Sequence, residues 1–132
     1  MSNPTFKHGA ITFPAGEALE KFRLVTVGKD GAVKLAGATG AIFGVVTEKA
    51  DPAVTTLPTN VAVHYGTAGV KIEVDGDATA IKAGAPVYAA AKGKCAASGT
   101  VQVGVAARDG VGTTVVTVVN KLPVAAGAGE GA

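Results

Sequence analysis

The sequence contains no tryptophan and few charged or aromatic residues for its 132 positions. Charged residues make up 17% of the chain, against about a quarter in a typical globular domain. Ten acidic and twelve basic residues give a formal net charge of +2, and the Lys and Arg residues form no run. Because binding to a nucleic-acid backbone requires a concentrated basic surface, we expect no nucleic-acid partner.

Cysteine, histidine and serine are equally scarce, and this limits the chemistry that the chain can support. Cys95 is the single cysteine, so an internal disulfide is excluded, and with His8 and His64 it does not form the spacing of a zinc site. Neither Ser2 nor Ser98 lies in the Gly-x-Ser-x-Gly turn that presents a nucleophile. We therefore expect no catalytic residues, no metal ligands and no cofactor.

Long apolar runs are also missing. The longest uncharged run near the end of the chain, residues 111–120, is rich in Gly and Thr and shorter than the ~20 apolar residues of a membrane-spanning helix. Near the start, Lys7 and His8 stand where a secretion signal would need an apolar stretch. We expect a soluble protein that is made in the cytoplasm and has no membrane partner.

Short segments of Val, Ala and Thr, separated by Gly, make up most of the chain. In residues 70–74, Val and Ile alternate with Lys and Glu, which is typical of a half-buried strand. Asp30-Gly31 predicts a hairpin turn, and we interpret the Gly-rich stretches 37–40 and 66–69 as further hairpin turns. About nine or ten such segments, with one helical turn expected within residues 78–82, predict an all-β fold, a small barrel or sandwich.

The second half of the sequence echoes the first at an offset of 62 residues. The matched positions are Phe22 with Gly84, Gly31 with Gly93, Val33 with Cys95 and, after a two-residue contraction, Gly44-Val45 with Gly104-Val105. This pattern predicts two similar β-units, at about residues 15–50 and 77–110, that share one core.

The strand patterns and the composition of the two ends divide the chain into one β domain and two arms. We place the β domain at residues 10–120, an N-terminal arm at 1–9 and a C-terminal arm at 121–132. The last eight residues are Ala, Gly and one Glu, a composition that cannot form a core element. Residues 111–119 are apolar on both alternating faces, which favours a central strand covered on both sides; the alternative is a strand with one face against another subunit.

A few remaining polar residues have structural interpretations as well as functional ones. Glu73, Asp75 and Asp77 could bind a cation, but their spacing lacks further oxygen ligands and fits a strand end followed by a turn. We expect His64 to be half-buried on a strand rather than a ligand or base. Cys95 matches Val33 in the repeat and is expected to be a small core residue.

Three segments together resemble a known protein family. They are Gly69-Val70-Lys71-Ile72-Glu73-Val74, Ile81-Lys82-Ala83-Gly84-Ala85-Pro86-Val87-Tyr88 and Val101-Gln102-Val103-Gly104-Val105-Ala106. Over roughly residues 60–120, with an earlier echo at 22–47, the chain resembles the small capsid cement, or head-decoration, proteins of tailed bacteriophages. The charged pair Glu20-Lys21 and the long Ala/Gly tail depart from the family's pattern.

The resemblance implies a structural protein without an active site. Such a protein binds the outer surface of the assembled capsid and stabilises the lattice of the major capsid protein, with neighbouring copies of itself, as a trimer or another homo-oligomer, as further partners. The expected contact residues lie in the arms: Pro4, Phe6, Leu122, Pro123 and Val124. The alternatives are a tail-tube or spike component and, with least support, a small β-fold enzyme that uses His64 with an acid such as Glu73.

Overall fold

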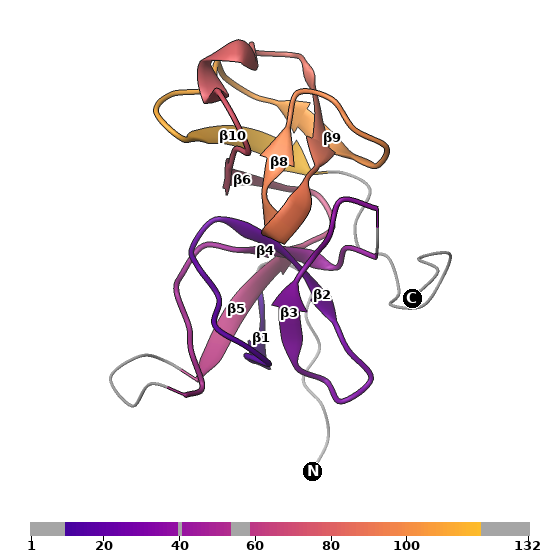
Figure 1. Ribbon diagram of the computed structural model, residues 1–132, viewed down its shortest axis with the longest axis vertical. Helices are drawn as coiled ribbons and strands as arrows, with labels where there is room; N and C mark the ends of the chain where they lie inside the picture. Colours follow the sequence, from indigo (N-terminus) through magenta and orange to yellow (C-terminus); the bar gives the residue numbers. More distant parts are fainter. Residues whose placement is uncertain (1–9, 40, 54–58, 120–132) are drawn as a thin grey trace.

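The structure, a computed structural model, describes residues 10–39, 41–53 and 59–119, and these residues form an all-β fold. The elements are β1 (Ile11–Pro14), β2 (Arg23–Val27), β3 (Val33–Leu35), β4 (Gly44–Val46), β5 (Asn60–Tyr65), β6 (Ala68–Glu73), η1 (Ala78–Ala80), β7 (Pro86–Ala89), η2 (Ala91–Gly93), β8 (Cys95–Ala96), β9 (Gln102–Ala106) and β10 (Thr114–Val119). The ten strands form two five-stranded antiparallel sheets, which stack along the long axis of the molecule (Figure 1). This architecture confirms the predicted fold class, and η1 confirms the predicted helical turn.

The two sheets have the same topology, strand for strand. The first has the order β1-β5-β4-β2-β3 and the second the order β6-β10-β9-β7-β8. The registers agree as well: Val25 pairs with Gly44 as Val87 pairs with Gly104, and the isolated bridge Ala15–Val33 corresponds to Val74–Cys95. These pairings confirm that the sequence matches are structurally equivalent positions. The equivalent units run from β1 to β5 and from β6 to β10, and so are longer than the segments 15–50 and 77–110.

The larger of two hydrophobic cores contains residues of both half-barrels, because β2 has a different neighbour on each face. Val25 points into the core of the first half-barrel, whereas Leu24, the next residue along the strand, belongs to the core of the second. Ile42 and Val45 also join the second core, and all four side chains are at most 1% exposed. The outer face of the first sheet therefore covers the second half-barrel. The described residues form one core shared by both halves and a second core within the first half-barrel, so the prediction of a single shared core is wrong.

Within the described residues, no further unit packs on the first half-barrel. Aromatic side chains cover its core instead. Equivalent positions in the two halves are Ile72 and Phe13, Val103 and Phe43, and Val119 and Tyr65. The aliphatic members are fully buried in the shared core, while the aromatic members are half-buried. Phe13 and Phe43 pack edge to face with ring centroids 5.5 Å apart, and Phe43 lies 6.1 Å from Tyr65. Larger rings thus shield a core that has no neighbouring sheet.

On the outer face of the first sheet, Leu24, Ile42 and Val45 join the two halves. The equivalent positions on the outer face of the second sheet are more polar. The equivalents of Leu24, Ile42 and Val45 are Pro86, Gln102 and Val105. Pro86 is exposed and the other two are half-buried. A third unit would have to bury the amide of Gln102, so the change in residue type favours a stack of two units.

Two of the three predicted hairpins are wrong. Asp30-Gly31 does turn β2 into its partner β3, with Gly31 at a φ of 82°. However, β3 and β4 are not paired, so residues 37–39 do not form a hairpin, and Gly40 lies outside the described residues. Residues 66–69 connect β5 of the first sheet to β6 of the second. Alternating strands on both sides of a glycine turn look the same in sequence whether the turn closes a hairpin or crosses between sheets.

The last strand is central in its sheet but is covered on one face only. β10 lies between β6 and β9, which confirms the central position. Val115, Thr117 and Val119 face the core and are at most 1% exposed, whereas Val118 on the other face is 37% exposed. The expectation of two covered faces is therefore wrong within this chain. Val and Thr are common in strands on both buried and open faces, so alternation of Val with Thr cannot reveal which face is covered.

Candidate docking surface

The predicted contact residues of the arms cannot be placed. Pro4, Phe6, Leu122, Pro123 and Val124 lie outside the described residues, as do both proposed arms in full. A surface for partners must therefore be sought on the two sheets and their connections.

The acidic residues after β6 are not gathered into a cation site. Asp77 caps η1, because its Oδ1 accepts hydrogen bonds from the Thr79 hydroxyl at 2.6 Å and the Thr79 N–H at 3.0 Å. These bonds, with the charge of Lys82 as a smaller contribution, lower the pKa of Asp77. Asp75 is exposed, and the described residues contain no group of three or more potential ligands that could hold a metal ion.

His64 and Cys95 have the structural positions expected of them. His64 is half-buried on β5, opposite Val45, and no hydrogen bond or ion pair among the described residues joins it to Glu73. Cys95 is fully buried in the shared core, with Sγ 3.9 Å from the carbonyl oxygen of Ile72. Burial, and then the charge of Glu73, raises the pKa of the Cys95 thiol to about 12.

The thiol of Cys95 should therefore be unreactive in the folded protein. We expect no labelling by a maleimide at pH 8 and complete labelling after unfolding, since the thiolate is the nucleophile. The unfolded thiol loses its proton near its usual pKa of 9.0 while the folded thiol keeps it up to about 12, so stability should fall as the pH rises through this interval. A Cys95→Ser variant measures the remaining pH dependence, and equal labelling of the folded and unfolded protein would contradict the burial of this thiol.

The exposed apolar side chains of the second sheet lie on the face of β6 and β10 that points away from the core. We call this surface the β6–β10 face, and its residues are Lys71, Thr114, Val116 and Val118 of the strands and Arg108 and Val111 of the β9–β10 connection. Val111 is 76% and Val118 is 37% exposed, and these are the exposed large hydrophobic residues of the described chain. These two valines and the half-buried Val116 are the apolar part of this candidate surface.

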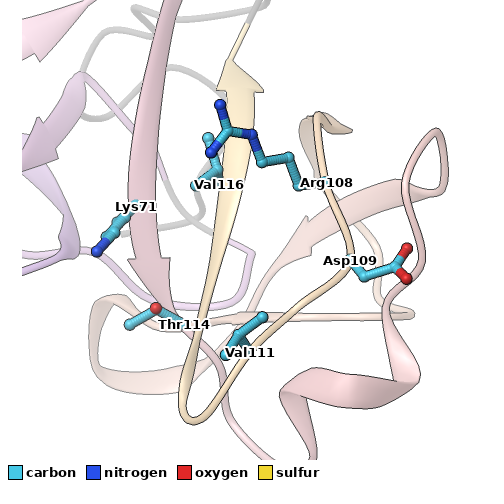
Figure 2. Close-up of a pocket in the computed structure, with 6 residues that line it drawn as sticks. All are labelled: Lys71, Arg108, Asp109, Val111, Thr114 and Val116. Carbon is cyan, nitrogen blue, oxygen red and sulfur yellow. The ribbon is translucent and has the colours of Figure 1, made fainter.

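The β6–β10 face is hollowed at one end, where it has cationic groups beside apolar ones. A cavity of about 240 Å³ is lined by Lys71, Arg108, Asp109, Val111, Thr114 and Val116. Lys71 lies opposite Val116 in the register of the two strands. Figure 2 shows the Arg108 guanidinium beside Val116, with Asp109 pointing away from both cations. The arrangement suits a partner with apolar and acidic groups, and it contains no nucleophile and base within reach of each other.

One side-chain and one backbone hydrogen bond hold the connection that carries Arg108 and Val111. Asp109 accepts a hydrogen bond from the Ala83 N–H at 2.8 Å, and the Gly110 N–H donates to the Ile81 carbonyl at 2.8 Å. The connection is thus tied to the segment between η1 and β7 and presents Arg108 in a defined position. The sequence contained one signal of this surface, the Val pairs of β10, but the cations come from separate elements that only the fold brings together.

Comparisons with known proteins give a likeness in fold. No family model and no curated protein matches the chain. The solved structure of the N base of head fiber gp8.5 from bacteriophage phi29 is similar, with a TM-score of 0.58 and 20% sequence identity. The match covers 86% of this chain and 96% of the phage protein. No helix of the described residues is long and apolar enough to cross a membrane. The match in structure therefore shows that the chain has a fold similar to that of the N base of the phi29 head fiber.

Proposed function

We propose that the chain is a structural protein of a phage virion that binds the outside of the assembled head and stabilises the lattice of the major capsid protein. The observation that carries this proposal is the likeness in fold to a phage head fiber base, which spans 86% of the chain. It agrees with the independent resemblance of residues 60–120 to capsid cement proteins. It agrees also with the exposed Val111 and Val118 on the β6–β10 face.

The proposed role requires binding energy and rigidity rather than catalysis. A protein that binds the assembled lattice more tightly than free subunits shifts the shell toward the assembled state by mass action. Many copies on one shell add their contributions, so a modest interface for each copy is sufficient. Neighbouring copies of this chain and the major capsid protein are the partners proposed for its exposed surfaces.

Binding to heads should be saturable and should depend on the assembled lattice. Mature heads of the phage that encodes the protein are mixed with increasing amounts of it and sedimented. We expect a fixed number of copies per head at saturation, and little binding to dissociated capsid subunits, because a site that bridges subunits exists only in the lattice. Failure to sediment with heads, or assembly of the protein alone into stacked rings, would contradict the proposal and favour a tail component.

The proposed arms are tested by truncation in the same assay. Removal of residues 1–8, or of residues 121–132, should reduce occupancy of the heads if Pro4 and Phe6, or Leu122, Pro123 and Val124, contact the capsid. Thermal melting of each truncated protein shows whether the β domain remains folded. Undiminished occupancy of both truncated proteins would exclude the arms as the attachment site.

A further inference from the structure

Phe22 has an unusual backbone conformation for its residue type. Its φ is 61°, in the left-handed region that side chains with a Cβ rarely adopt. The equivalent position in the second half is Gly84, with a φ of 85°, as expected where the chain requires this conformation. The fold thus needs a positive φ at both positions, and only the first half uses a bulky aromatic residue there.

The backbone role of this position does not require the Phe22 ring. The Phe22 carbonyl oxygen accepts a hydrogen bond from the Glu73 N–H at 2.8 Å, and this bond connects the first half to β6 of the second. Because the bond uses main-chain atoms alone, a glycine at position 22 could accept it without the strain. The retained ring therefore points to a role for the side chain itself.

The half-buried ring of Phe22 lies close to two cations. Lys21 Nζ is 5.4 Å and Lys71 Nζ is 5.9 Å from the ring centroid. Both lysines are exposed, and Lys71 also lines the cavity of the β6–β10 face. Lys71 therefore connects the Phe22 ring with the cavity that Arg108 lines.

Positive charge on this surface is incompletely compensated. Among the described residues, the ion pair found joins Lys49 and Glu20, and Lys21, Lys71 and Arg108 take part in none. The acids on the same elements are Glu17, Glu20, Glu73 and Asp109. Glu20 pairs with Lys49, and Glu17 accepts a hydrogen bond from the Leu35 N–H at 2.9 Å. Asp109 lines the cavity, but its carboxylate accepts a hydrogen bond from the Ala83 N–H and points away from Lys71 and Arg108 (Figure 2), and Glu73 is half-buried with Oε2 enclosed and without a hydrogen-bond partner.

We propose that Phe22, with Lys21 and Lys71 beside its ring and Arg108 in the cavity that Lys71 also lines, is the anchor by which this protein binds a carboxylate-bearing apolar segment of a partner protein. The ring and Val116 supply apolar contact area, and the three cations supply charge complementary to Asp or Glu side chains. This inference rests on the proposed attachment to heads, which makes the partner segment part of the capsid surface.

The Phe22→Gly variant separates binding from folding. Glycine is the residue already used at the equivalent position, so we expect a melting temperature equal to or above that of the wild type. Affinity for mature heads in the sedimentation assay should nevertheless fall about tenfold or more, because an aromatic anchor is lost. A lower melting temperature with unchanged head binding would show that the ring serves packing alone, and would overturn the proposal.

The charges are tested with a matched pair of substitutions. Lys71→Glu should reduce head binding about tenfold or more and should make the remaining binding less sensitive to salt. Lys29→Glu makes the same change in net charge on an exposed lysine of the β2–β3 turn, at the far end of the first half-barrel (Figure 1), and should have little effect. Equal effects of the two substitutions would overturn the proposal.

A soluble competitor identifies the chemistry of the partner. Poly-L-glutamate should displace the wild-type protein from heads, and should displace it at lower concentrations than a DNA duplex with the same number of charges. Stronger competition by DNA would assign the surface to phosphate groups and contradict a carboxylate partner. If the wild type itself does not bind heads, the proposed function fails; if it binds and the Phe22 and Lys71 variants bind equally well, the function stands and this anchor is wrong.

Discussion

Replacement of Gly104 by alanine should destabilise the protein by about 3 kcal/mol. A Cβ at position 104 would overlap the carbonyl oxygen of Val118 on the neighbouring strand. The same substitution at Gly44 would overlap the carbonyl oxygen of His64, which is the residue equivalent to Val118 in the first half. The close approach is therefore a property of the repeated unit, and Gly44→Ala should have a similar cost.

A matched control for these substitutions lies on β6. Gly69 pairs with Val118 from the other side of β10, has no positive φ, and a Cβ there would meet no atom within 4 Å. Gly69→Ala should leave the free energy of unfolding unchanged or slightly raised. Denaturation in urea measures all three variants, and a cost at Gly69 equal to that at Gly104 would contradict the assigned register.

Leu24→Ala should cost about 3 kcal/mol and should weaken both halves together. Leu24 belongs to the first sheet but is fully buried in the core of the second half-barrel. Its removal leaves a cavity at the junction that holds the two halves. Leu35→Ala, on the half-buried edge strand β3, should cost clearly less because its side chain already contacts water.

The shared core also predicts a single unfolding transition. The chain has two tyrosines, Tyr65 on β5 and Tyr88 on β7, one in each half. Fluorescence of the Tyr88→Phe variant reports the first half, and fluorescence of the Tyr65→Phe variant reports the second. After correction for the stability of each variant by circular dichroism, both probes should follow the global transition. Separate midpoints for the two probes would show that the halves fold independently.

The sequence was informative wherever a local rule acts on neighbouring residues. Alternation in residues 70–74 located β6, and Asp30-Gly31 located the first hairpin, because side-chain direction and turn geometry are set within a few residues. The match of Gly44-Val45 with Gly104-Val105 revealed the repeat, because a glycine is required at each close approach of two strands. These features depend on residue type at neighbouring or repeated positions and are therefore visible in a single sequence.

Features that depend on how the two sheets pack against each other were not predicted. The glycine stretch at 66–69 connects two sheets instead of closing a hairpin, and β10 has one open face instead of none. The charged surface was missed for the same reason, since Lys21, Lys71 and Arg108 are far apart in the sequence. Phe22 was aligned with Gly84 from the sequence, but the meaning of that mismatch required the φ angle of both residues.

Electron cryomicroscopy of mature heads saturated with the protein tests the central claim most directly. The account predicts additional density of this two-unit fold at symmetric positions on the outer surface of the shell, with the side that carries Phe22 and the β6–β10 face toward the capsid. A shell that is unchanged at saturating protein, or density confined to the tail, would contradict attachment to the head.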